Sequence, residues 1–116
     1  MPEIVTMGEL LCEIMRPSED TELYETGEFP SGAPGIFIST AARLGCRAGI
    51  IAGVGKDDFG KNILDRLKKD GVDLSRVLES DKGPTGTAFV TYYSNGDRKF
   101  IFHVVGTPAV EPKAPA

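Results

Sequence analysis

The chain has 116 residues, of which 41% are hydrophobic and 26% are charged, and its formal net charge is −4. This length allows one domain at most, because domains usually span about 100–200 residues. The mild acidic excess provides no basic surface for nucleic acid or anionic lipid. No apolar run approaches the roughly 20 residues that a membrane helix needs. We therefore expect neither a nucleic-acid partner nor a membrane partner.

The cysteine and histidine content excludes further classes of protein. The two cysteines, Cys12 and Cys46, lie in apolar segments, which favours free, buried thiols in a reducing cytoplasm. The single histidine, His103, belongs to no cluster of Cys and His. We therefore expect no metal site.

The first part of the chain alternates strand and helix patterns. Residues 3–15 are predicted as one strand that begins with a continuous apolar run, and residues 48–54 as a second buried strand. Between them lie a shorter, more polar strand at 23–29 and a helix at 34–44 with Pro34 near its start. This alternation predicts a parallel, layered α/β core.

The clearest helix is predicted over residues 58–70. Its apolar side chains follow the 3.6-residue period at Phe59, Ile63, Leu64 and Leu67. An Asp is available as its N-cap, and Gly71 suits the position just after its end. Lys61 and Asp65 form an i,i+4 pair on its exposed face.

The last two strands are predicted as a hairpin at 85–93 and 99–105. The Asn95-Gly96 pair between them indicates a type I′ turn. The hairpin and the more polar strand do not suit the interior of a parallel core, so we expect a small side sheet that projects from it. Residues 106–116 hold three of the eight prolines and are predicted to be a linker or a frayed end.

Residues 55–62 match a phosphate-binding loop, G-x-x-x-x-G-K-[ST], through seven positions. The eighth position is Asn62, where the motif needs a hydroxyl for Mg²⁺, and Asp57 and Asp58 oppose a bound phosphate by charge. We favour a structural interpretation, in which Gly55 permits a tight turn and the two carboxylates cap the next helix. A nucleotide-binding loop stays as a less favoured alternative.

Two features are candidates for ligand binding. Glu13 is expected at the carboxyl end of a central strand, where open α/β sheets bind ligands. Pairing it with Glu9 for hydrolysis is rejected, because four strand residues span roughly 13 Å whereas glycosidase carboxylates lie about 5–9.5 Å apart. The turn at 31–35 opens a helix, and its glycines allow a ligand to approach the backbone.

Taken together, these segments resemble the N-terminal part of the ribokinase/PfkB family of sugar kinases. The matches run in order from about residue 4 to residue 107. They are the first strand in Thr6–Ile14, the Gly-Gly-Ala-Pro-Ala-Asn signature and its helix in Ser31–Gly45, the Val-Gly-x-Asp-x-Phe-Gly turn in Val54–Gly60, and the lid hairpin in Pro84–Ala88 and Asn95–Phe100. The sequence of residues 29–38 is most similar to that of a fructokinase-like or tagatose-kinase-like branch.

The resemblance implies an α/β/α layered, Rossmann-like core with a small β-sheet lid. Residues 1–107 would be the N-terminal, substrate-side part, with lid strands at 23–29 and 85–105, and residues 108–116 a Pro/Ala-rich tail. It also implies transfer of the γ-phosphoryl group of ATP, with Mg²⁺, to a ketohexose or a keto-sugar acid, and a homodimer formed through the lid. The residues that it places at the sugar are Glu13, Gly32, Ala33, Ile36, Arg98 and Phe100.

Two departures from the family pattern shape the functional expectation. Ile36 stands where the signature has Asn, which removes a polar sugar contact. The family's Gly-Ala-Gly-Asp motif, which carries its catalytic Asp and anion hole, does not occur in this chain. We therefore expect no catalytic residue here and no activity from the chain alone, which would be the sugar-binding and lid part of a kinase. The alternative is a non-catalytic module that binds sugar or forms a dimer.

Overall fold

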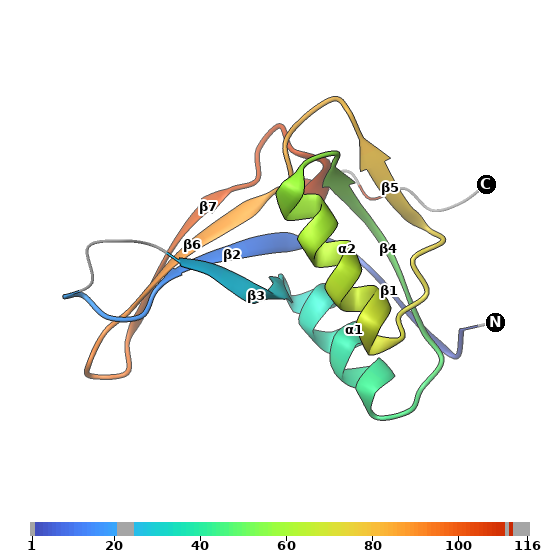
Figure 1. Ribbon diagram of the computed structural model, residues 1–116, viewed down its shortest axis with the longest axis horizontal. Coiled ribbons are helices and arrows are strands. Elements are labelled where there is room, and N and C mark those ends of the chain that lie inside the picture. The colour runs from blue at the N-terminus through green and yellow to red at the C-terminus, as the bar shows by residue number, and fades with distance from the viewer. Residues whose placement is uncertain (1, 21–24, 111, 113–116) are drawn as a thin grey trace.

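The computed structural model describes residues 2–20, 25–110 and 112, and its strands form two sheets (Figure 1). The first, the core sheet, is parallel and has the order β1-β4-β5, with β1 at Ile4–Met7, β4 at Ala48–Gly55 and β5 at Val77–Ser80. The second, the lid sheet, has the order β3-β2-β6-β7, with β2 at Leu11–Arg16, β3 at Glu25–Ser31, β6 at Thr87–Tyr92 and β7 at Arg98–His103.

Two helices, α1 (Ala33–Arg43) and α2 (Asp58–Asp70), cover one face of the core sheet (Figure 1). Every second residue of β4 is buried against them, and Ile50 and Val54 have no exposed area. These side chains pack in one cluster with Leu67 of α2. The continuous apolar strand therefore forms the centre of the hydrophobic core, and the predicted parallel α/β layers are confirmed.

Helix α2 begins and ends at the predicted residues. Asp57 Oδ1 accepts a hydrogen bond of 2.8 Å from the backbone N–H of Gly60, which is the N-cap contact expected for an Asp. The predicted pair of Lys61 and Asp65 is present at 2.7 Å. Within the described part of the chain, neither α1 nor α2 is long and apolar enough to cross a membrane.

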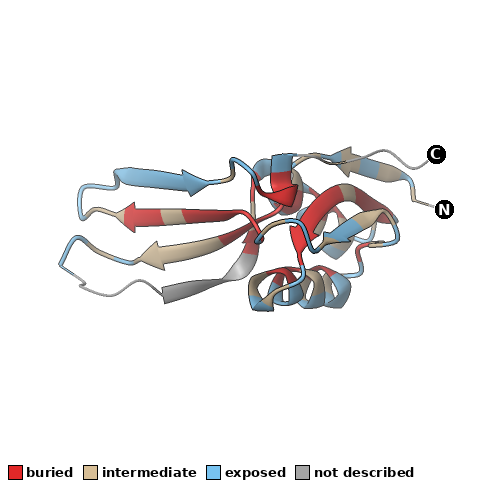
Figure 2. Ribbon diagram, turned by 90° about the horizontal axis from the view of Figure 1, so that it is seen from above, coloured by how far each residue is buried: buried red, intermediate tan, exposed pale blue. Residues whose placement is uncertain are grey.

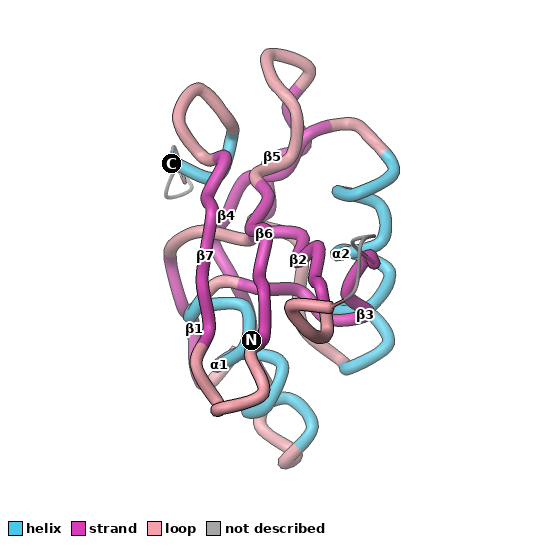
Figure 3. The backbone as a smooth tube through the Cα atoms, turned by 90° about the vertical axis from the view of Figure 1, so that its left-hand side faces the viewer, coloured by secondary structure: helices cyan, strands magenta, loops and turns pink. Residues whose placement is uncertain are grey.

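The lid sheet extends away from the core and is less buried on its outer side (Figures 1 and 2). Strand β6 is mostly buried, whereas β7 at its edge is exposed along its whole length. Figure 3 shows β7, β6 and β2 side by side, and the register of β2 is parallel to β6 and antiparallel to β3. The predicted side sheet is confirmed, but β2 at its centre was expected in the core.

The prediction of one strand over residues 3–15 is wrong, because the chain changes sheets at 8–10. The N–H of Gly8 donates to the carbonyl of Ile51 at 3.1 Å, at the end of the pairing with the core sheet. The N–H of Cys12 then donates to the carbonyl of Gly86 at 2.9 Å, at the start of the lid. Glu13 consequently lies inside a lid strand and not at the carboxyl end of a core strand.

The predicted hairpin is confirmed, but its turn is not of type I′. Among the described residues only glycines have positive φ, so Asn95 cannot take the left-handed conformation that type I′ requires, whereas Gly96 has φ of 90°. The carbonyl of Tyr93 accepts a hydrogen bond from the N–H of Gly96 at 3.0 Å. The N–H of Tyr93 donates to the carbonyl of Asp97 at 2.9 Å. This pattern is a type I turn followed by a glycine bulge.

The predicted frayed end also differs from the structure. Residues Pro108–Val110 form a short 3₁₀ helix, η1, and Ala109 is buried in a cluster with Leu11, Ala88 and Val90. The packed part of the chain therefore reaches beyond residue 107. Residues 111 and 113–116 of the predicted tail, like residues 23 and 24 of the predicted polar strand, lie outside the described residues.

Asp57 also bonds to the segment that enters the lid. Its Oδ2 accepts the N–H of Thr85 at 2.9 Å, and its Oδ1 accepts the hydroxyl of the same residue at 2.6 Å. Burial acts to raise the pKa of Asp57, but hydrogen bonds from Thr85, Gly60 and Phe59 together outweigh it and hold the pKa below its ordinary value of 3.8. A lowered folded-state pKa means that this stabilisation is present above pH 3.8 and is lost as the pH falls through the folded value.

We predict that Asp57→Ala lowers the free energy of unfolding by about 2–3 kcal/mol at pH 7, because it removes a helix cap and two bonds to Thr85. The difference from the unaltered protein should shrink as the pH falls below 3.8. Urea denaturation at several pH values measures both effects. Asp58→Ala is the matched control, because it removes an exposed carboxylate of the same helix end and should cost about 0.5 kcal/mol or less. Equal losses in the two variants would contradict the prediction.

Candidate functional site

A cavity of about 400 Å³ lies between the lid sheet and helix α1. Its wall on the lid side comes from β2, β6, β7 and the end of β3, and its wall on the core side comes from the exposed face of α1. The residues that line it are Glu13, Pro30, Ser31, Ile36, Ser39, Thr40, Arg43, Tyr92, Arg98 and Phe100. Four of the six residues predicted at the sugar, namely Glu13, Ile36, Arg98 and Phe100, are among them.

Strand register explains why side chains from three lid strands meet here. Alternate residues of a strand share one face, so Tyr92 lies on the same face of β6 as Ala88, which is the partner of Glu13 in β2. Tyr92 is in turn the partner of Arg98 in β7. The face of the lid that is turned toward α1 therefore carries a carboxylate, a phenol and a guanidinium in adjacent strands.

Tyr92 connects the two charged groups. Its hydroxyl donates to Oε1 of Glu13 at 3.3 Å. Burial, and after it the negative charge of Glu13, raises the pKa of Tyr92 above its ordinary value, while the positive charge of Arg98 acts in the opposite direction. Tyr92 therefore stays protonated at neutral pH and remains a hydrogen-bond donor to the carboxylate. Sequence reasoning missed this residue as a site residue.

Two other polar residues of the cavity serve to hold the helices together. Asp70 of α2, whose side chain is only 6% exposed, accepts Nε of Arg43 at 2.9 Å. It also accepts the hydroxyl of Ser39 at 2.6 Å. The guanidinium of Arg43 is thus already paired with Asp70, and the other cation that lines the cavity is Arg98, the cross-strand partner of Tyr92.

Gly32 and Ala33, also predicted at the sugar, lie at the start of α1 and do not line this cavity. Gly32 is the N-cap residue, is buried, and has φ of 90°. A Cβ at this position would lie 2.7 Å from the carbonyl oxygen of Glu9. Glycine is therefore required here by the close passage of the chain from β1 to β2, and Ala33 is exposed beside it.

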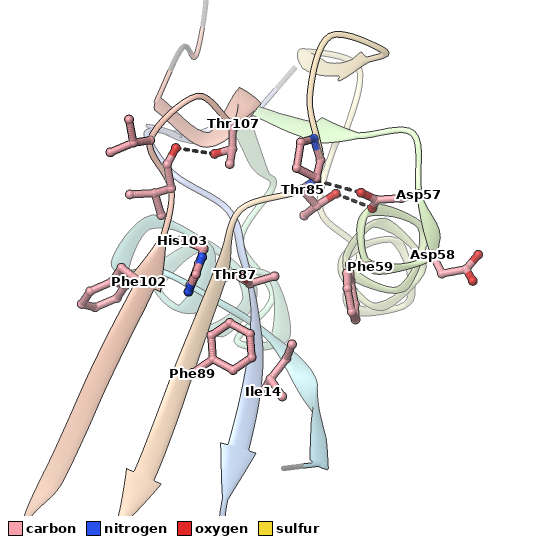
Figure 4. A pocket seen from close by; sticks show the side chains of 13 residues that line it. Ile14, Asp57, Asp58, Phe59, Thr85, Thr87, Phe89, Phe102, His103 and Thr107 are labelled. Carbon is pink, nitrogen blue, oxygen red and sulfur yellow. Dashed lines mark hydrogen bonds between the residues drawn. The ribbon is translucent and has the colours of Figure 1, made fainter. Parts of the chain in front are cut away.

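A larger cavity of about 870 Å³ lies between the lid and the start of α2 (Figure 4). Its walls are mainly apolar, and the rings of Phe89 and His103 meet edge to face in it at 5.2 Å. Asp57 and Thr85 are bonded to each other, and Asp58 points away from the other labelled side chains in Figure 4. Asp57, Thr85 and Thr107 of this cavity are already hydrogen-bonded, and four of the predicted site residues line the smaller cavity. We therefore take the smaller cavity as the candidate ligand site.

The loop at 55–62 does not fit a phosphate group. The N–H of Gly60, which such a loop would offer to phosphate, already donates to the carboxylate of Asp57. The ammonium of Lys61 is paired with Asp65. The structural interpretation of the motif is confirmed in part: Asp57 caps α2, but Asp58 shows no capping bond. Gly55 is needed for close packing, because an added Cβ would lie 2.6 Å from the backbone N of Thr85. No step of nucleotide chemistry is assigned to this loop.

Cys12 does not fit the role of a nucleophile either. Its side chain is buried, and burial raises the pKa of its thiol to about 11, with a smaller contribution from the charges of Asp57 and Glu13. The thiolate, which is the reactive form, is therefore scarce at neutral pH. Cys12 is a packing residue of the core, as the sequence indicates.

Residues 1–113 match the pfkB family of carbohydrate kinases, and the chain belongs to this family. It is 35% identical to Fructokinase-2 of Oryza sativa subsp. japonica over 103 residues, which are 86% of this chain and 31% of the rice protein. It is 37% identical to 2-dehydro-3-deoxygluconokinase of Bacillus subtilis (strain 168) over 105 residues, 87% of this chain and 32% of that protein.

Solved structures show the same fold. An E. coli protein described as a candidate ribokinase II superposes in its apo form with a TM-score of 0.82 at 41% identity, over 94% of this chain and 36% of that one. Its complex with ATP and Mg²⁺ superposes with a TM-score of 0.80. The expected ribokinase-like fold is therefore confirmed, and the chain spans about a third of the length of these relatives.

We predict that Gly32→Ala lowers the free energy of unfolding by about 2–4 kcal/mol, since it adds both a left-handed backbone penalty and a clash with Glu9. Gly45→Ala is the matched control. Gly45 has φ of 97°, but no atom lies within 4 Å of its added Cβ, so only the backbone penalty of about 1–2 kcal/mol applies. Urea denaturation of both variants gives the difference, and equal losses would show that the contact with Glu9 is easily relieved.

Proposed function

We propose that this chain is the sugar-binding and lid part of an ATP-dependent sugar kinase, which we call the parent enzyme. The observation that carries the proposal is the cavity in which the lid holds Glu13, Tyr92 and Arg98 against helix α1. A carboxylate and a guanidinium that line the same cavity can accept from and donate to different hydroxyls of one sugar. Membership of the carbohydrate kinase family supports the same activity.

For the substrate we propose a ketohexose or a keto-sugar acid. The relatives named as fructokinase and 2-dehydro-3-deoxygluconokinase support this class. Glu13 would accept hydroxyl protons of the sugar, while Arg98 would donate to its oxygens. Ile36 and Phe100 give the cavity an apolar side, which suits the carbon skeleton of a sugar. We also propose that the sugar approaches the backbone closely at Gly32 and Ala33.

ATP, Mg²⁺ and the catalytic groups are proposed to bind to residues of the parent enzyme that lie outside this chain. The chain holds no Gly-Ala-Gly-Asp motif, and its one phosphate-loop-like segment is filled by Asp57. Within the described residues β1 is an edge strand, and Val5 and Met7 on it are about half exposed, at 47% and 53%. Further strands and helices of the parent enzyme could cover the exposed side of β1 that carries Val5 and Met7. The free thiols of Cys12 and Cys46 support the cytoplasm as its location.

We predict that Glu13→Ala lowers kcat/KM for the sugar about 10-fold or more in the parent enzyme, because charge-assisted hydrogen bonds to sugar hydroxyls contribute roughly 1.5–3 kcal/mol each. The KM for ATP should change little. Steady-state phosphorylation of D-fructose and of 2-dehydro-3-deoxygluconate measures both constants.

The control for this experiment is Glu79→Ala, which removes an exposed carboxylate of β5, outside the candidate sugar cavity.

The 116-residue chain alone should produce no sugar phosphate, since transfer needs an anion hole and a base that it lacks. Turnover by the chain alone would contradict the proposal that the catalytic groups lie outside it. Unchanged sugar kinetics in Glu13→Ala would show that Glu13 does not bind the sugar.

We also propose that the parent enzyme is a homodimer that forms through the lid. The edge strand β7 is exposed, with Phe100, Ile101 and Phe102 at 47%, 46% and 57% exposed. Its outer edge carries no strand within the described residues. An exposed apolar edge strand favours pairing with a second sheet, and a two-fold contact lets the same surface serve both copies.

We predict that Ile101→Lys raises the dissociation constant of this dimer by 10-fold or more, because it places a charge among the apolar side chains near Phe89, its cross-strand partner. Light scattering over a dilution series of the parent enzyme measures the constant. Val110→Lys is the control, since Val110 is also half exposed but lies in η1, beside the core. A monomer at high micromolar concentration in the unaltered protein would exclude the dimer.

A further inference from the structure

Tyr92 is held by two different kinds of contact. Its ring packs against the buried cluster that Leu11, Ala88 and Val90 form in the lid. Its hydroxyl reaches back along the sheet to Oε1 of Glu13. The ring is thus held by packing and the hydroxyl by Glu13, and Tyr92 lines the candidate sugar cavity.

The hydrogen bonds have a fixed direction across the lid. The raised pKa of Tyr92 keeps its proton in place, so the hydroxyl donates to Glu13. Arg98 is the cross-strand partner of Tyr92 in β7, and a guanidinium can only donate, so Arg98 cannot accept the proton of the phenol. The hydroxyl of Tyr92 therefore directs its proton to Glu13.

The hydrogen bond from Tyr92 makes the two carboxylate oxygens of Glu13 different from each other. Tyr92 takes Oε1, which leaves Oε2 as the acceptor for a sugar hydroxyl. The distance of 3.3 Å is longer than the usual O–H···O bond of about 2.7–2.8 Å, and such contacts often shorten when a ligand binds. Without the hydroxyl of Tyr92, the carboxylate could rotate and both oxygens would be unrestrained.

We propose that Tyr92 is a positioning residue for the sugar: it orients Glu13, and through Glu13 it selects the hydroxyl that the carboxylate accepts. The proposal rests on the sugar kinase function stated above. Tyr92 acts on the binding of the sugar and makes no contact with the phosphoryl group that is transferred. Its removal should therefore change the KM for the sugar and leave kcat nearly constant.

The test is Tyr92→Phe in the parent enzyme, which keeps the ring in its apolar cluster and removes only the hydroxyl. We expect the KM for the preferred sugar to rise about 5–10-fold, with kcat and the KM for ATP within about 2-fold. Tyr93→Phe is the matched control. It removes a hydroxyl from the next residue, which begins the turn after β6 and does not line the cavity, and it keeps the ring.

A double-mutant cycle separates positioning from a general structural role. In the Glu13→Ala background, Tyr92→Phe should cause no further rise in the KM, because the residue through which Tyr92 acts is gone. The same rise in both backgrounds would overturn the proposal, and so would an unchanged KM in Tyr92→Phe alone. If Glu13→Ala impairs sugar binding while Tyr92→Phe does not, only the role of Tyr92 fails. Absence of sugar phosphorylation by the unaltered parent enzyme would overturn the proposed function and the role of Tyr92 together.

Discussion

The carboxylate of Asp57 joins the core of this protein to its lid. One oxygen caps α2 through Gly60, and the two oxygens together bind the backbone and hydroxyl of Thr85 where the chain enters β6. The hydroxyl of Thr85 also accepts the N–H of Gly55 at 2.9 Å, at the end of β4. A core strand, a core helix and a lid strand are thus fixed at one point. In the sequence motif at 55–62, Asp57 opposes a bound phosphate by its charge. In the structure, the same carboxylate orders this loop.

The two sheets that meet at this point are stabilised in different ways. The core sheet is centred on β4, whose alternate residues are buried under two helices. The lid has only a small cluster of its own around Leu11, Ala88, Val90 and Ala109, and β7 at its edge is exposed. A sheet with so little buried apolar surface has marginal stability alone. Its attachment through Asp57 and Thr85, and the return of the chain through η1, therefore matter for the position of every residue in the lid.

Local sequence patterns were sufficient for the elements that local interactions determine. Helix α2 was predicted to the residue, since its period and caps lie within the segment itself, and the hairpin followed from alternation and Asn95-Gly96. The break at 8–10 was not visible, because both flanking strands are apolar and the change of sheet depends on distant partners, Ile51 and Gly86. Four cavity residues came from the family motifs. Tyr92 was missed, because its contact with Glu13 requires the pairing of β2 with β6, which no local pattern contains.

The cavity has one wall from the lid and one from the core, so its shape depends on the angle between them. Three of the chain crossings between core and lid, β1 to β2, β3 to α1 and β5 to β6, each contain a glycine packed against a neighbouring segment. An added Cβ would lie 2.6 Å from the ring of Pro34 at Gly8, 2.7 Å from the carbonyl oxygen of Glu9 at Gly32, and 2.8 Å from the side chain of Leu11 at Gly86. Such close packing resists rotation at the crossings. Glu13, Tyr92 and Arg98 are consequently presented to α1 at a set distance, which organises the proposed sugar cavity before any ligand enters it.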